Sequence, residues 1–179
     1  MICSKLGLCI DEELSGKQPS KCDNSRTKCI ESSDNRSNVK CEENKKKYIL
    51  ENTLREHVIS CRMDGGIVVE DMNVPKGMNR CDYLLVDGKR EKTAILVELK
   101  GVNVSDALKQ ISNTLVIFRD FFSSFQHVYG RAVVVSAVPN LKATPEYVKL
   151  DKALRAKYKG NLKIGKIKFS EKDVELSKT

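Results

Sequence analysis

The segment Thr93–Gly101, which reads TAILVELKG, constrains the fold more than any other part of the chain. Its apolar run is almost continuous, and such runs are typical of strands that are buried on both faces of a sheet. The residues before it, DGKREK, contain Asp87 followed by Gly88, a pair that favours a tight hairpin turn. The sequence therefore predicts a hairpin whose second strand lies inside a covered sheet.

The remaining periodicities predict helices and strands that alternate along the chain. In the first predicted helix, Leu50, Leu54, Val58 and Cys61 share one face at spacings of three and four residues. The expected order is a helix over Tyr48–Cys61, strands over Ile67–Glu70, Arg80–Val86 and Thr93–Gly101, a helix over Ser105–Phe125, a strand over Arg131–Val138, a helix over Thr144–Lys159 and a last strand over Asn161–Phe169. This order indicates an α/β fold in which helices flank a mixed central sheet.

The first 47 residues differ from the rest in being polar and without periodicity, which predicts an irregular N-terminal extension over 1–47 and one domain over 48–179. The chain has seven cysteines, and five of them lie in this extension. Thiolates of Cys9, Cys22, Cys29 and Cys41 are a candidate metal set. No C-x2-C pair or nearby histidine supports it, so scattered free cysteines are the favoured interpretation.

The net charge of +8 indicates an anionic partner, for which nucleic acid is the common case. Residues 142–179 hold 11 basic and 5 acidic residues, so the excess is concentrated there. A surface made soluble by surplus lysine is the alternative. Neither a secretory leader nor an apolar run of membrane-spanning length is visible, so we expect a soluble cytoplasmic protein with no membrane partner.

Glu98 and Lys100 stand two residues apart on a predicted strand, so both side chains point to one face. The preceding predicted strand carries Asp82 near its start, and both carboxylates lie about eight residues from the intervening turn. Two carboxylates and an ammonium group would then converge. Carboxylate oxygens suit Mg²⁺, and a neighbouring lysine can lower the pKa of a metal-bound water or hold it in line with a phosphate.

Asp82 and the Glu98-Leu99-Lys100 triplet, with the apolar AILV before it and Gly101 behind, resemble the PD-(D/E)xK nuclease superfamily, whose fold is called restriction-endonuclease-like. The resemblance covers roughly residues 48–169 and implies a core of αβββαβ order. It also implies an endonuclease that uses Mg²⁺ or Mn²⁺ and leaves a 5′-phosphate. By this resemblance, Asp82 and Glu98 bind the metal and Lys100 assists the attacking water.

The resemblance adds two further candidates. Many members use a glutamate of the first helix, and Glu51 is preferred to Glu56 because it borders the apolar face of the predicted helix. Some branches use a glutamine of the helix after the E-x-K strand, where Gln110 stands. Thr114 occupies the position of a tyrosine in one branch, and Cys81 replaces the proline of the motif name. The cysteine pattern differs from that of the iron–sulphur branch.

The E-x-K triplet alone is uninformative, since Glu43-Asn44-Lys45 also matches it in a polar run. Three other interpretations of the group formed by Asp82, Glu98 and Lys100 stay open. Glu98 and Lys100 could form a solvated ion pair at a strand end. A silent module could bind nucleic acid or protein, or a subunit could cut only within a homodimer or larger complex joined through the N-terminal arm. DNA is the expected substrate, although the residues do not separate it from RNA.

Overall fold

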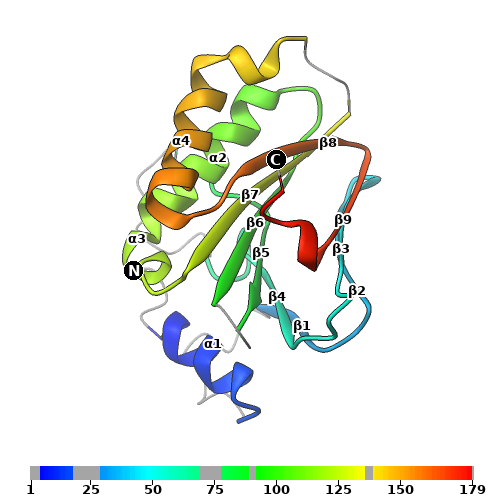
Figure 1. Cartoon of the computed structure of the whole chain (residues 1–179), viewed down its shortest axis with the longest axis vertical. Coiled ribbons are helices and arrows are strands. Elements are labelled where there is room, and N and C mark those ends of the chain that lie inside the picture. Colours follow the sequence, from blue (N-terminus) through cyan, green and yellow to red (C-terminus); the bar gives the residue numbers. More distant parts are fainter. Residues whose placement is uncertain (1–4, 18–28, 69–77, 89–91, 136–138, 179) are drawn as a thin grey trace.

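The computed structural model describes residues 5–17, 29–68, 78–88, 92–135 and 139–178. It is a mixed α/β structure in three layers, in which a large sheet lies between a layer of helices and a smaller sheet (Figure 1). No helix in the described part of the chain is long and apolar enough to cross a membrane.

The large sheet has six strands in the order β1-β4-β5-β6-β7-β8. Strands β4 to β6 form an antiparallel meander, and β7 and β8 continue it in parallel. The predicted hairpin is therefore confirmed, and helix α2 makes the crossover between the parallel neighbours β6 and β7. The strands are β1 (Ile30–Asp34), β4 (Val58–Arg62), β5 (Tyr83–Asp87), β6 (Thr93–Leu99), β7 (His127–Val134) and β8 (Leu162–Lys166).

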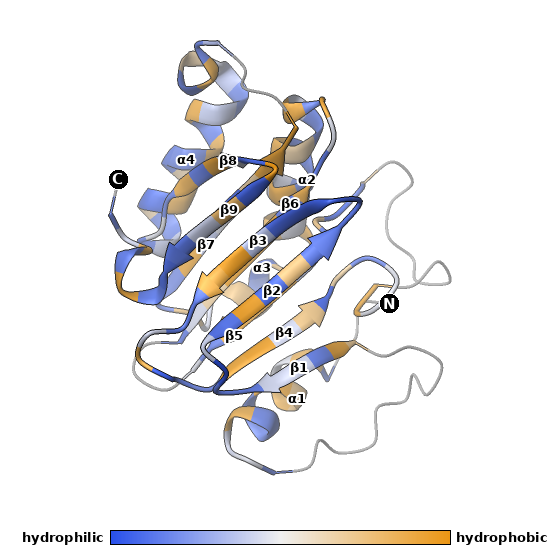
Figure 2. Cartoon of the chain, turned by 90° about the vertical axis from the view of Figure 1, so that its right-hand side faces the viewer, coloured by the Kyte–Doolittle hydropathy of each residue, from blue (hydrophilic) through white to orange (hydrophobic). Residues whose placement is uncertain are grey.

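The small sheet contains β2 (Asn38–Glu43), β3 (Lys46–Glu51) and β9 (Lys168–Lys172), and it covers one face of the large sheet (Figure 2). Between the sheets lies an apolar core to which β3 contributes Tyr48 and Leu50 and β6 contributes Ile95 and Val97. Strand β6 is thus covered on both faces, which explains its nearly continuous apolar sequence.

The helices cover the other face of the large sheet and enclose a second core (Figure 1). They are α1 (Leu6–Leu14), α2 (Val104–Ile117), the short α3 (Arg119–Phe122) and α4 (Pro145–Tyr158), with the 3-10 turn η1 (Leu141–Ala143) just before α4. A second 3-10 turn, η2 (Asp173–Glu175), follows β9 on the side of the small sheet. As predicted, Thr144 caps α4 and Pro145 is its first residue. The cap of α2 is Asn103 instead of Ser105, since its side chain accepts from the Asp106 N–H.

The predicted helix over Tyr48–Cys61 is wrong, because this segment forms the end of β3, a turn and most of β4. The turn is held by buried Asn52, whose amide group exchanges hydrogen bonds with the backbone of Glu56 at 2.7 and 3.0 Å. Arg55 adopts a left-handed φ of 54°, which no helix contains. The helical spacing of the apolar residues arose by chance from two strands joined across this turn.

The described residues before position 48, which are 5–17 and 29–47, are also not an irregular extension. They contain α1, β1, β2 and the first two residues of β3, so the expected boundary at 47/48 falls inside a strand. The last predicted strand is in fact two strands, β8 in the large sheet and β9 in the small sheet. The chain passes from one sheet to the other at Ile167, where φ is 49°. Ile67 and Val68 lie in a turn with a single bridge to Asp64, and Glu70 is outside the described residues.

A charged group lies inside the structure, where the sequence predicted only a buried strand. Arg131 on β7 has no exposed surface and forms a salt bridge with Glu171 of β9. Tyr48 donates to the same carboxylate at 2.8 Å, and Arg131 donates to the Leu176 carbonyl at 3.1 Å. These bonds tie the C-terminal segment to the space between the two sheets.

Candidate functional site

The candidate site lies where β6 ends and β5 begins, at one end of the predicted hairpin. Tyr83 pairs with Val97 in the antiparallel register, so the preceding Asp82 is brought to the end of β6 that carries Glu98. The Leu99 N–H donates a hydrogen bond of 2.7 Å to Oδ2 of Asp82. The structure therefore places Asp82 beside the Glu98–Lys100 segment, as the sequence predicted.

Alternation along β6 sets the direction of Glu98 and Lys100. Ala94 and Leu96 pack into the helix-side core, so Glu98 and Lys100 belong to that same face of the sheet. Leu99 points the other way, into the core between the sheets. Because the strand ends at Leu99, Glu98 is still enclosed by the fold, whereas Lys100 is only half-buried.

Glu98 is a buried carboxyl group with an unsatisfied oxygen. Its residue is 1% exposed, and no described residue hydrogen-bonds to its Oε2 atom. Burial, followed by the negative charge of Asp82, raises the pKa of Glu98 to about 9. Burial also raises the pKa of Asp82, to about 6, against the lowering effect of the Leu99 N–H. Such groups are costly unless a charge or ligand compensates them, so this pair is suited to binding a cation.

Gln110 on α2 joins this group, as the sequence analysis proposed. Its Oε1 atom accepts a hydrogen bond of 2.8 Å from Nζ of Lys100. Its Nε2 group donates at 3.0 Å to the carbonyl of Arg80, two residues before Asp82. Gln110 thus links the ammonium group to the segment that carries the carboxylate, and it fixes where the Lys100 side chain lies.

Thr114, one turn further along α2, supports the same segment. Its buried hydroxyl accepts from the Cys81 N–H at 2.9 Å and donates to the Gln110 carbonyl at 2.8 Å. A threonine in place of the expected tyrosine therefore has a local structural reason, and buried Cys81 lies directly beside Asp82 at this point of attachment.

Glu51, the predicted third carboxylate, does not reach this group. It is the last residue of β3 and accepts a hydrogen bond from Ser170 on β9. The end of β3 near the site is instead the one that begins with Lys46, which pairs with Glu43 of β2. The placement of Glu51 depended on the predicted helix, and it fails because that helix is absent.

The third carboxylate near the site is Glu43, which the sequence analysis passed over. The Tyr83 hydroxyl donates at 3.1 Å to the carbonyl of Glu42, which brings the end of β2 to the start of β5. The negative charge of Glu43 contributes to raising the pKa of both Asp82 and Glu98. The sequence contained one signal for Glu43. Val39, Cys41 and Glu43 alternate with polar residues, a pattern that indicates a strand whose buried face ends in a carboxylate.

The residues present fit a hard divalent cation. Among the described residues, no three His, Cys, Asp or Glu side chains already form a cluster that could hold a metal ion. Side chains would thus supply only two ligands, one from Asp82 and one from the unsatisfied oxygen of Glu98. Backbone carbonyls and water would complete the coordination shell of the cation. This is a common arrangement for Mg²⁺, which keeps several of its waters.

Other candidates contribute little to this site. Cys22 lies outside the described residues, while Cys9, Cys29 and Cys41 form no metal cluster with the described residues. The two histidines have structural contacts. His57 bonds to the Ser33 hydroxyl at 2.7 Å, and His127 bonds to the Lys159 carbonyl at 3.1 Å.

Comparisons with protein-family models, with curated proteins and with solved structures found no match to this chain.

Proposed function

We propose that this protein is an endonuclease that hydrolyses phosphodiester bonds of DNA with Mg²⁺ or Mn²⁺ and leaves a 5′-phosphate. The observation that carries the proposal is the partnerless buried oxygen of Glu98, next to Asp82 and on the same face as Lys100. A buried carboxyl group next to a second, half-buried one is costly to maintain without a ligand, even beside an ammonium group. Binding of a divalent cation offsets that cost and draws a phosphate to the same place.

The arrangement of elements supports the same proposal. The meander β4-β5-β6, the crossover helix α2 and the parallel strand β7 are similar to the βββαβ part of the restriction-endonuclease-like core. The motif residues also lie at the expected ends of β5 and β6. The helix that would precede this core is α1 over Leu6–Leu14, since residues 48–61 form part of β3, a turn and part of β4.

Each residue has a defined part in the proposed reaction. Asp82 and Glu98 hold the cation, which when bound supplies positive charge to the phosphate and lowers the pKa of a coordinated water. Lys100 lies on the same face, where its ammonium group orients the water and offsets negative charge on the phosphate. Gln110 is a positioning residue, because it holds Lys100 through a hydrogen bond of 2.8 Å.

A module that binds nucleic acid without cutting is the second candidate, and one observation favours it. With a pKa of about 9 and no metal, Glu98 is neutral at pH 7 and so does not repel a phosphate. The pair would then carry only the charge of Asp82, which Lys100 on the same face can offset without a cation. Measurement of metal binding and cleavage separates the two functions.

The test is cleavage of plasmid, single-stranded and branched DNA, and of RNA, in Mg²⁺, Mn²⁺ or EDTA. The wild-type chain should cut in either metal and not in EDTA, and its products should be substrates for a ligase that requires a 5′-phosphate. Lys100→Ala and Glu98→Gln should lose cleavage, whereas Lys157→Ala, on the exposed last turn of α4, should retain it. Absence of cutting on every substrate, or cutting that survives EDTA and both variants, would refute the nuclease proposal.

A further inference from the structure

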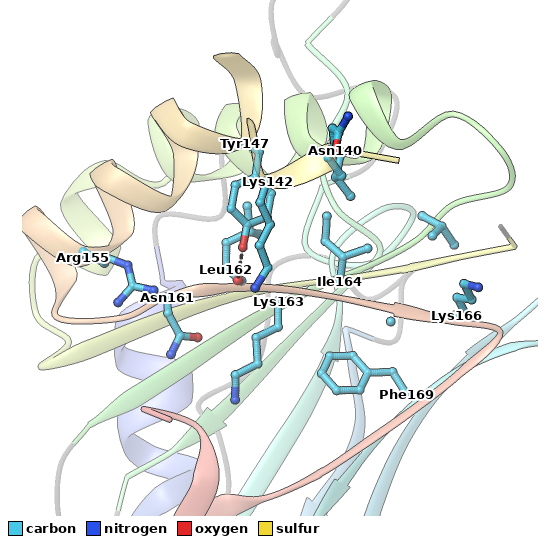
Figure 3. Close-up of a pocket in the computed structure, with 13 residues that line it drawn as sticks. Asn140, Lys142, Tyr147, Arg155, Asn161, Leu162, Lys163, Ile164, Lys166 and Phe169 are labelled. Atoms are coloured by element: carbon cyan, nitrogen blue, oxygen red, sulfur yellow. Dashed lines mark hydrogen bonds between the residues drawn. The ribbon is translucent and has the colours of Figure 1, made fainter. Parts of the chain in front are cut away.

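A pocket of about 700 Å³ lies at the free edge of the large sheet, next to β8, η1 and the start of α4 (Figure 3). Strand β8 is the last of the six, so the pocket borders the described sheet where no further strand pairs. Its volume is in the range of about 300–1,000 Å³ that small ligands occupy. The proposed nuclease site does not include this pocket.

The lining is positively charged. Four basic residues, Lys142, Arg155, Lys163 and Lys166, contribute to it, and the described lining contains no aspartate or glutamate. Arg155 is paired with Asp151, and Lys163 with Glu171. Lys142 and Lys166 are exposed and form no salt bridge within the described part of the chain, so two cationic groups remain available to an anionic ligand.

Two aromatic residues of the described lining, Tyr147 and Phe169, border the pocket, and the Phe169 ring is held at a fixed position. Phe169 is half-buried and packs edge-on against Tyr48, with 5.6 Å between ring centroids. A Cβ atom on Gly165 would lie 2.4 Å from Cβ of Phe169. Because Gly165 has no side chain, the Phe169 ring can lie across β8 at this position. In Figure 3 the ring lies below Ile164, between Lys163 and Lys166. A ring held in this way is a suitable platform for a stacked base.

Backbone pairing places this pocket near the candidate site. The Lys100 N–H donates to the Val133 carbonyl at 2.9 Å, and Val133 is in turn paired with Gly165 of β8. Two strand spacings, or about 10 Å, therefore separate the end of β6 from the floor of the pocket. This corresponds to about three nucleotides of a stacked strand, at 3.4 Å per nucleotide.

We propose that this pocket binds a single-stranded segment of nucleic acid a few nucleotides from the phosphodiester to be cut. Lys142 and Lys166 contact its phosphates, and one unpaired base stacks on Phe169. The inference rests on the proposed nuclease function for the position of the scissile bond. Single strands are favoured over duplex because a base that stacks on a protein ring has left its own helical stack.

The test is binding of the full chain in EDTA, where no cleavage occurs, to a short fluorescein-labelled single strand and to the same strand in blunt duplex. Fluorescence anisotropy from about 50 to 200 mM salt gives the affinity and its salt dependence. The double variant Lys142→Ala/Lys166→Ala should bind the single strand about tenfold more weakly. The slope of log affinity against log salt should decrease by about 1.4, or 0.7 for each lost phosphate contact.

A matched control removes the same charge elsewhere. Lys149→Ala/Lys157→Ala neutralises two exposed lysines of α4 that do not line the pocket, so its salt slope should equal that of the wild-type chain. Phe169→Leu should weaken single-strand binding about tenfold with an unchanged slope, since only stacking is lost. Thermal unfolding of each variant shows that the comparison concerns folded protein.

Two results would overturn the inference: equal effects of the pocket and control variants, or equal affinity for single strand and duplex. The inference would also be overturned, in favour of an acidic protein partner, if the double lysine variant weakened binding of an oligo-glutamate peptide as much as it weakened binding of DNA. The outcome is independent of cleavage. Pocket-dependent binding without cutting refutes the nuclease proposal, and with it the position of a scissile bond, but keeps the single-strand site, whereas cutting with binding unaffected by the pocket variants refutes only this inference.

Discussion

The carboxylate of Asp82 accepts a hydrogen bond of 2.7 Å from the backbone N–H of Leu99, the residue between Glu98 and Lys100. This bond joins the start of β5 to the end of β6 just beyond their last paired residues. One carboxylate is thereby fixed to the backbone that carries the other one and the lysine. The proposed cation site is therefore assembled by the hairpin itself, before any metal binds.

The metal-free protein should become less stable as pH rises. The folded chain holds the Glu98 proton up to a pKa of about 9, whereas the unfolded chain loses it near the ordinary value of 4.5. Between these values the folded state binds more protons, so the free energy of unfolding falls by at most about 1.4 kcal/mol per pH unit from this group. Asp82 adds to the decrease between 3.8 and about 6.

Urea unfolding in EDTA across this pH range measures the effect. Glu98→Gln carries no titrating proton at this position, so it should flatten the decrease above about pH 7, where Asp82, with a pKa of about 6, is already mostly ionised in the folded chain. A variant whose stability declines with pH as steeply as that of the wild-type chain would show that Glu98 titrates normally in the folded state.

Metal binding should depend on Glu43 and not on Glu51. Titration of Mn²⁺ into the wild-type chain should raise the melting temperature and release protons, because ligating carboxyl groups must ionise. Glu43→Gln should weaken Mn²⁺ binding about tenfold, since it removes a negative charge close to the cation. Glu51→Gln and Glu42→Gln should leave the affinity unchanged.

The two controls differ in what they exclude. Glu42 is the exposed neighbour of Glu43 on β2, so Glu42→Gln controls for the loss of one negative charge from the chain. Glu51 is the glutamate that the sequence favoured, at the other end of β3. An affinity that falls with Glu51→Gln would mean that the structural assignment of the third carboxylate is wrong.

Gln110 and Lys100 should act as one unit in catalysis. Gln110→Ala removes the acceptor that holds the ammonium group at 2.8 Å, and we expect kcat to fall about 10- to 100-fold with little change in KM. Lys100→Ala should cost more. In the double variant the loss of kcat should not exceed that of Lys100→Ala alone, because Gln110 acts only through Lys100.

A purely structural role for Gln110 gives a different result. In that case the two losses would multiply, and the melting temperature of Gln110→Ala would fall as its activity falls. The double-mutant cycle on kcat, with unfolding curves for all four proteins, distinguishes these outcomes.

Removal of one partner of the buried Arg131–Glu171 pair should destabilise the protein strongly. Arg131→Met leaves the Glu171 carboxylate enclosed with less compensation, which typically costs about 3–5 kcal/mol. Glu42→Gln, which breaks the exposed pair with Lys47, should cost about 1 kcal/mol or less. Chemical denaturation gives both values, and a cost below about 1 kcal/mol for Arg131→Met would show that the buried pair contributes little.

The sequence determined the parts of the fold that depend on local patterns. The hairpin around Gly88, the doubly buried strand β6 and the cap of α4 at Thr144 all follow from turn chemistry, continuous apolarity and capping preference. The proximity of Asp82 to the end of β6 also followed, because register in a hairpin is fixed by counting outward from its turn.

Only the tertiary structure decided how residues before position 62 are used. The spacing of Leu50, Leu54 and Val58 satisfies a helix and equally a pair of strands with a turn at Asn52, and pairing of β3 with β9 selects the strands. That pairing joins residues more than a hundred positions apart, and no local pattern encodes it. Together with the pairing of β2 and β3, it removes Glu51 from the site, brings Glu43 near it and forms the small sheet that covers the opposite face of β6.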